Sequence, residues 1–121
     1  MFKKMIPSGR GHFYIAFDDD VPCGLVSFGN SRDENMSDYA EIVAIYTLQS
    51  YWGKGIGEKL MKFTLSEIKK QGFQNVMLWV FEQNARARSF YEKHGFVFDG
   101  TFKGSGFANT NEVRYRLELI L

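Results

Sequence analysis

The stretch Tyr51–Leu60 reads YWGKGIGEKL and carries glycines at three alternate positions, Gly53, Gly55 and Gly57. The chain before it, residues 40–47, is rich in β-branched and aromatic residues, which favours a strand. After it, apolar residues recur at helical spacing as far as Ile68. The stretch is therefore predicted to be the turn between a strand and a helix.

A turn of this kind suits a phosphate group. Glycine has no Cβ, so the backbone can approach a ligand closely, and the first helical turn offers free N–H groups and the positive end of its dipole. The spacing excludes the dinucleotide fingerprint, because Gly55 and Gly57 lie only two positions apart, and no Lys-Ser/Thr pair follows as in a P-loop. An ordinary glycine-bearing loop without a ligand is the alternative.

A second segment, Asn84–Phe96, reads NARARSFYEKHGF. It follows a strand-like run over residues 74–81 and is predicted to be a short helix, with Asn84 at its N-cap and Gly95 just past its end.

The two segments together resemble the GCN5-related N-acetyltransferase (GNAT) superfamily. The acetyl-coenzyme A motif of that superfamily maps onto Trp52–Gly57, although Trp52 stands where a basic residue or Gln is usual. The resemblance covers roughly His12 to Leu119. The second motif of the superfamily is matched by Asn84, Ala87, Phe90, Tyr91, Gly95 and Phe96.

The predicted fold class is α/β, with a mixed sheet and helices on its faces, in the order β-β-β-α-β-α-β-β and in a single domain over residues 1–121. The strands are expected at residues 12–18, 24–29, 40–47 and 74–81, followed by a hairpin over 96–121. The long helix should make a right-handed crossover between two parallel strands. The superfamily normally begins with a further strand and helices, which the short segment before His12 is expected to lack.

The composition of the chain limits the kinds of partner that it is expected to bind. The chain has 121 residues and a net charge of +1, which gives no basic field for nucleic acid. The absence of a long apolar run and of a signal peptide favours a cytoplasmic protein that does not bind membranes. The single cysteine, Cys23, cannot form an internal disulfide and has no clustered partners for a metal, so no metal is expected.

The resemblance implies where acetyl-CoA, the expected cosubstrate, would bind. Its pyrophosphate would lie on the backbone N–H groups of residues 53–57, and its pantetheine arm along the strand edge at Ile45 and Thr47. Asn84 would bond the pantetheine, cap the helix, or do both. Cationic side chains near the phosphates are either ligands or ordinary solvated helix charges. The predicted coenzyme residues are Ile45, Thr47, Trp52, Gly53, Lys54, Gly55, Ile56, Gly57, Asn84, Arg88 and Lys93.

Two residues are predicted to be catalytic. By resemblance, Tyr91 donates a proton to the departing thiolate, and its ordinary pKa near 10 keeps the phenol protonated at neutral pH; packing on the short helix is the alternative. Glu41 is the candidate base that deprotonates the amine, directly or through a water; an ordinary solvated or ion-paired strand residue is the alternative. The sequence leaves other candidate bases open, namely Tyr39, Glu34, Asp38 and Glu112.

These expectations define an N-acetyltransferase that moves an acetyl group from acetyl-CoA to a primary amine of a small molecule or a peptide, by direct attack in a ternary complex. A non-catalytic acyl-CoA-binding module, or a fragment of such an enzyme, is the alternative. The strand at residues 12–18 is expected to present an open edge beside an uncovered apolar surface, which favours a homodimer or, alternatively, a weakly active monomer whose acceptor site is loose.

Overall fold

The computed structural model describes residues 2–5, 11–106 and 110–119. Its strands are β1 (Phe2–Met5), β2 (Gly11–Asp18), β3 (Val21–Asn30), β4 (Ala40–Thr47), β5 (Asn75–Phe81), β6 (Val97–Gly104) and β7 (Asn111–Glu118). Its α-helices are α1 (Ile56–Lys70) and α2 (Ala85–Lys93), and two short 3₁₀ helices, η1 (Glu34–Met36) and η2 (Gln49–Tyr51), flank β4.

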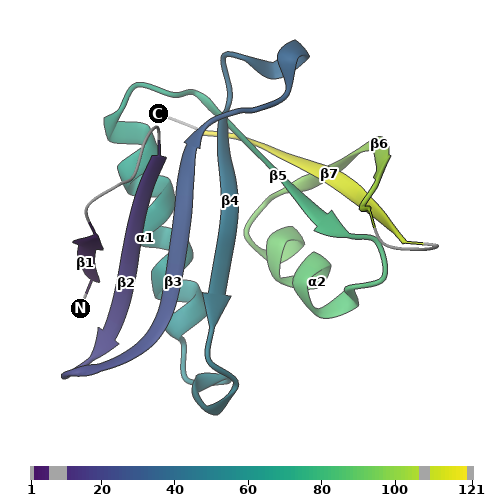
Figure 1. Ribbon diagram of the computed structural model, residues 1–121. Coiled ribbons are helices and arrows are strands. Elements are labelled where there is room, and N and C mark those ends of the chain that lie inside the picture. Colours follow the sequence, from purple (N-terminus) through teal and green to yellow (C-terminus); the bar gives the residue numbers. More distant parts are fainter. Residues whose placement is uncertain (1, 6–10, 107–109, 120–121) are drawn as a thin grey trace.

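The strands form one mixed sheet in the order β1-β2-β3-β4-β5-β7-β6 (Figure 1). Neighbouring strands are antiparallel except β4 and β5, which are parallel. Helix α1 is the crossover between those two strands, as predicted. The mixed α/β fold expected from the sequence is confirmed.

The N-terminal strand β1 is one more element than the sequence predicted. It pairs with β2 in an antiparallel ladder from Phe2 opposite Ala16 to Met5 opposite Phe13. The expectation that β2 has an open edge is therefore wrong, because β1 occupies that edge. The segment FKKM shows no apolar-polar alternation, so periodicity gave no signal for it. The argument for a homodimer built through an edge of β2 no longer holds.

The main core lies between α1 and one face of the sheet. Helix α1 buries Leu60, Met61, Thr64 and Ile68 on one side. The three apolar residues among them pack in one cluster with the inward residues Val26, Phe28 and Ile42 of β3 and β4. Tyr91 of α2 joins the same cluster beside Phe96 and Tyr115. Both helices thus hold the sheet from the same side, and this fixes α2 relative to the start of α1.

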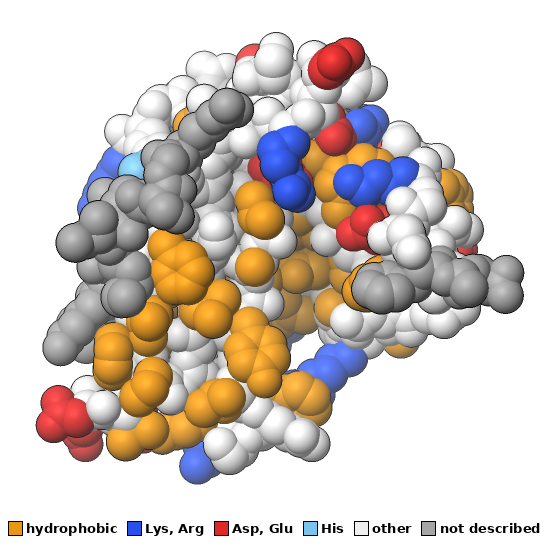
Figure 2. Space-filling model, viewed as in Figure 1, with side chains coloured by type: hydrophobic (Ala, Val, Ile, Leu, Met, Phe, Trp, Pro, Cys, Tyr) orange, Lys and Arg blue, Asp and Glu red, His pale blue; other side chains and the backbone are white. Residues whose placement is uncertain are grey.

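No helix of the described residues covers the opposite face of the sheet over β2, β3 and β4. Figure 2 shows hydrophobic side chains gathered there, and Val43, Tyr46 and Leu48 are exposed large apolar residues of β4 and its end. Over β5, β7 and β6 the same face carries an ion-pair network instead: the Arg114 guanidinium contacts Asp33 at 3.3 Å and Asp99 at 2.6 Å. The apolar surface expected from the sequence is thus present, although the strand edge beside it is paired.

Candidate active site

The site begins where β4 and β5 part. Their ladder has three residue pairs, from Ala40 opposite Val76 to Ile42 opposite Leu78. Directly after it, β4 has a bulge against β3, because Ala44 pairs with Ser27 and Ile42 with Phe28, which leaves Val43 without a partner residue. A bulge bends its strand and increases the local twist. Beyond it the two strands diverge (Figure 1).

The diverging part of β4 has an open edge. Along an antiparallel ladder, successive residues turn their backbone groups alternately toward and away from the partner strand. The Leu48 N–H donates to the Cys23 carbonyl of β3, so the backbone groups of Ile45 and Thr47 face the open side. These are the two residues that the sequence analysis assigned to this edge.

The glycine turn lies at the end of β4. Gly53 and Gly55 have φ values of 80° and 81°, in the left-handed region that disfavours other residues. Gly55 is the N-cap of α1. Gly57 serves a different purpose, because a Cβ on it would lie 3.3 Å from the ring of Phe90 in α2. The turn therefore needs glycine twice for its conformation and once for contact between the two helices.

A cleft of about 790 Å³ lies between the end of β4, the glycine turn and α2. Predicted site residues that line it are Ile45, Thr47, Trp52, Gly53, Gly55, Ile56, Gly57, Asn84, Tyr91 and Lys93. The sequence analysis did not assign several further lining residues to the site, namely Tyr46, Tyr51, Glu58, Arg86, Ala87, Ser89 and Phe90. Helical periodicity could have indicated Arg86 and Phe90, because residues four apart share a face of a helix.

Tyr91 lies in the wall of the cleft. Its side chain is 9% exposed, and burial raises the pKa of its phenol to about 12. No described residue bonds to its hydroxyl, while its ring packs edge-on against Phe90 and Phe96. A phenol with so high a pKa keeps its proton throughout the physiological range.

Asn84 caps α2, as one of the two alternatives predicted. Its Oδ1 accepts a hydrogen bond from the backbone N–H of Ala87 at 3.0 Å, which satisfies one of the free donors at the start of the helix. Asn84 also lines the cleft.

The cationic residues separate into two groups. Lys93 lines the cleft and contacts Glu58 at 2.7 Å, and the hydrogen bond from Lys93 lowers the pKa of Glu58. Arg88 does not line the cleft, because its guanidinium donates to the Tyr115 hydroxyl at 2.8 Å and to the Glu82 carbonyl at 2.9 Å. Lys54 does not line it either, and its ammonium lies over the ring of Tyr51.

Glu41 is buried in the paired part of β4, on the face opposite Ala40 and Ile42. Its carboxylate accepts three hydrogen bonds, all from Arg32. The Glu41 side chain is 2% exposed, whereas that of Arg32 is 65% exposed. Glu41 does not line the cleft, and neither do the other candidate bases from the sequence, Tyr39, Glu34, Asp38 and Glu112.

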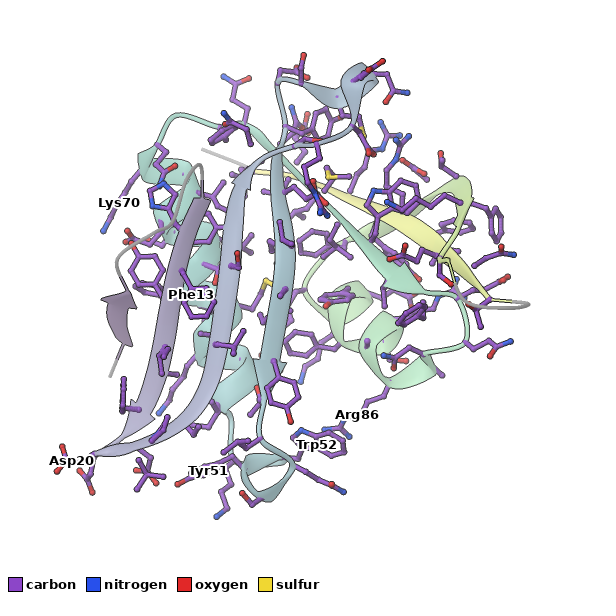
Figure 3. All side chains as sticks on the ribbon, in the orientation of Figure 1. Phe13, Asp20, Tyr51, Trp52, Lys70 and Arg86 are labelled. Carbon is purple, nitrogen blue, oxygen red and sulfur yellow. The ribbon has the colours of Figure 1, made fainter. Side chains whose placement is uncertain are left out.

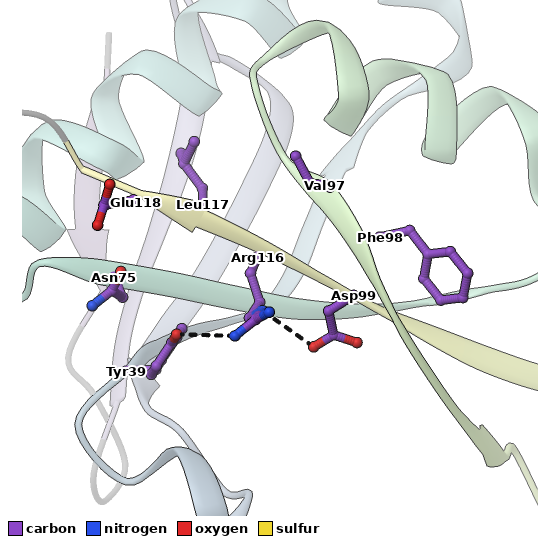
Figure 4. A pocket seen from close by; sticks show the side chains of 8 residues that line it. All are labelled: Tyr39, Asn75, Val97, Phe98, Asp99, Arg116, Leu117 and Glu118. Atoms are coloured by element: carbon purple, nitrogen blue, oxygen red, sulfur yellow. Dashed lines mark hydrogen bonds and ion pairs between the residues drawn. The ribbon is translucent and has the colours of Figure 1, made fainter.

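A second cavity of about 340 Å³ lies at the paired end of β5 (Figure 4) and shares no lining residue with the cleft. Arg116 in its wall is held between Asp99 at 3.4 Å and the Tyr39 hydroxyl at 3.5 Å.

Within the described ranges, no three His, Cys, Asp or Glu side chains are grouped to hold a metal ion. No helix in the same ranges is long and apolar enough to cross a membrane.

Comparisons with known proteins agree with this geometry. A protein of Mycobacterium tuberculosis named probable N-acetyltransferase is 31% identical over 96% of this chain and 66% of its own length. The spermidine N(1)-acetyltransferase of Thermoplasma acidophilum is 32% identical over 78% of this chain and 55% of its own. The chain spans about half to two thirds of the length of the curated relatives it matches.

A similar solved structure is the PaiA N-acetyltransferase of Thermoplasma acidophilum in complex with coenzyme A. It superposes with a TM-score of 0.75 at 27% identity, over 90% of this chain and 61% of that one. Residues 1–96 match the family model described as Acetyltransferase (GNAT) family. This match agrees with the strand-glycine-helix turn, the diverging strands β4 and β5, and the tyrosine in the cleft between the turn and α2. The chain belongs to the GNAT family of acetyltransferases.

Proposed function

We propose that the protein transfers the acetyl group of acetyl-CoA to a primary amine, with the coenzyme bound in the cleft between the end of β4, the glycine turn and α2. The observation that carries the proposal is that one cleft joins the N-terminus of α1 at Gly55, an open strand edge at Ile45 and Thr47, and the buried phenol of Tyr91. The relatives named as N-acetyltransferases and the coenzyme A complex of a similar structure support it.

Each part of the cleft fits one part of the coenzyme. The N–H groups of the glycine turn and the first turn of α1 would bind the pyrophosphate without a metal, through hydrogen bonds and the helix dipole. The backbone groups of Ile45 and Thr47 would pair with the amides of pantetheine as an added strand does. A backbone N–H of this edge aimed at the thioester oxygen would stabilise the developing oxyanion by about 3 kcal/mol.

The reaction then needs two proton transfers. The amine nitrogen attacks the thioester carbon, the C–S bond breaks, and the leaving thiolate takes the proton of the Tyr91 hydroxyl. The attacking nitrogen loses its extra proton to a base. Glu41 is proposed for this role, through a water or after Arg32 has moved away, because Arg32 occupies both oxygens of its carboxylate.

Direct transfer in a ternary complex is favoured over an acetylated enzyme. The one cysteine of the chain, Cys23, is fully buried in the core under α1, and burial raises the pKa of its thiol. A thiol that is neither exposed nor ionised does not act as an acetyl carrier. Initial-rate lines at varied acetyl-CoA and amine should therefore intersect, and Cys23→Ala should keep its activity.

The deciding experiment is release of free thiol from acetyl-CoA over a panel of acceptors that includes spermidine, a monoamine and a peptide with a free N-terminus. Acetylation of at least one acceptor, lost in Tyr91→Phe, supports the proposal. Coenzyme A binding without thiol release on any acceptor would show the alternative, a non-catalytic acyl-CoA-binding module.

A further inference from the structure

Trp52 and Arg86 meet across the mouth of the cleft. Trp52 comes from the glycine turn and Arg86 from the first turn of α2, so the two belong to opposite walls. The guanidinium carbon of Arg86 lies 3.7 Å from the centre of the Trp52 ring, and Figure 3 shows the two side chains together at the lower end of β4. Both residues line the cleft.

The indole of Trp52 is fixed in place. Its Nε1 donates a hydrogen bond to the Thr47 carbonyl at 3.1 Å. That carbonyl is the last acceptor on the open edge of β4. The indole therefore stands at the end of the channel along this edge and forms a platform that faces α2.

Arg86 is held less firmly. It is exposed, and no carboxylate of the described residues lies within ion-pair distance of it, so its described partner is the face of the indole. A cation–π contact at an exposed site is weaker than a charge-assisted hydrogen bond to a phosphate. An anion that enters the cleft can thus take Arg86 from the ring.

We propose that the Trp52–Arg86 contact is a gate across the coenzyme entrance. It is closed in the free protein, and Arg86 moves from the indole to the diphosphate as the coenzyme enters. This inference rests on the proposed function. It also explains the tryptophan at position 52, where the motif usually has a basic residue or Gln: α2 supplies from across the cleft the charge that position 52 lacks.

Two variants test the gate and the phosphate contact independently. Trp52→Leu removes the platform and keeps the charge of Arg86, so the association rate of coenzyme A should rise about 2- to 5-fold, the equivalent of ~0.5–1 kcal/mol for an exposed cation–π contact. Arg86→Gln removes the phosphate ligand, so the dissociation rate should rise about 10-fold or more, as expected for a hydrogen bond from a charged group. Both side chains are exposed, and both variants should fold.

The rates are measured by stopped flow with coenzyme A labelled on its sulfur, at ~0.15 M salt, where charges beyond a Debye length are screened. The control is Lys103→Gln, which removes another cation–π contact, 4.2 Å from the Trp79 ring, outside the residues of the cleft. It should keep both wild-type rates. An unchanged association rate in Trp52→Leu would overturn the gate, and an unchanged dissociation rate in Arg86→Gln would overturn the transfer to phosphate. If wild-type protein fails to bind the probe, the proposed function falls and the gate with it.

Discussion

Arg32 holds the carboxylate of Glu41 from two directions, with its backbone N–H 2.9 Å from Oε1 and its Nη2 2.7 Å from Oε2. The carboxylate is buried and the guanidinium is largely exposed. Removing the Arg32 side chain therefore leaves a buried carboxylate, whereas removing the Glu41 carboxylate leaves a guanidinium that is exposed to water.

We expect Arg32→Ala to lower the free energy of unfolding by about 2–3 kcal/mol, because it strands a buried charge. Glu41→Gln should cost clearly less, since the guanidinium it leaves can be hydrated. Urea denaturation of both variants at neutral pH gives the comparison, and equal costs would contradict the asymmetry.

Glu41→Gln also tests the proposed base. Loss of a general base typically lowers the rate 10²- to 10⁴-fold, and coenzyme affinity should not change, because Glu41 does not line the cleft. The measurement is kcat at saturating amine beside a titration of coenzyme A. Full activity in a folded Glu41→Gln variant would exclude Glu41 as the base. The remaining candidates from the sequence would then be Tyr39, Glu34, Asp38 and Glu112.

Tyr91→Phe should lower turnover about 100-fold or more with little change in coenzyme binding, because the ring and its packing stay while the proton is lost. The pH dependence gives a second test. Since the pKa of Tyr91 is raised to about 12, the active protonated form persists well above the usual tyrosine pKa near 10. Loss of activity attributable to Tyr91 should therefore set in only as the pH approaches 12, and a Tyr91-dependent fall near pH 10 would contradict its burial.

Gly55→Val should weaken coenzyme A binding at least 10-fold, because a branched side chain would project from the turn on which the pyrophosphate is proposed to lie. The matched control is Gly72→Val. Both glycines have positive φ and open space around the added Cβ, so the two substitutions should introduce a similar backbone strain. Gly72 lies at the far end of α1, away from the proposed pyrophosphate site. Calorimetry that showed equal affinities in the two folded variants would place the coenzyme elsewhere.

Asp99→Asn should destabilise the β6–β7 hairpin by about 3 kcal/mol, because Asp99 is 3% exposed and binds Arg114 at 2.6 Å. Burial alone would raise the pKa of Asp99, but hydrogen bonds from Arg114 and Thr101 outweigh it and lower the pKa. This stabilisation is present above the ordinary Asp pKa and is lost as the pH falls through the lowered one. Unfolding free energies should therefore converge between wild type and variant in strong acid, which thermal or urea melts at several pH values can check.

The sequence was sufficient for the fold and for most of the cleft, because the relevant signals are local. Glycine spacing, helical periodicity and the cap at Asn84 each depend on a few consecutive residues. It was not sufficient for Arg88, whose position within the second motif says nothing of the hydrogen bonds to Tyr115 and Glu82 that turn it away. The ion pair of Glu41 with Arg32, nine residues earlier in the chain, depends on how the loop after β3 folds back onto β4. Strand β1 is too short and too irregular in pattern to be predicted.

The three-residue ladder between β4 and β5 has a consequence for how the protein persists in a cell. Side-chain contacts also join the two halves of the sheet, among them Arg114 with Asp33, Arg116 with Tyr39 and Lys93 with Glu58. A coenzyme laid along Ile45 and reaching α2 would act as a missing strand and cross-link the halves. Since a ligand stabilises the folded state by about 2.7 kcal/mol at a hundredfold excess over its Kd, the abundance of this protein, and not only its turnover, would follow the acetyl-CoA supply.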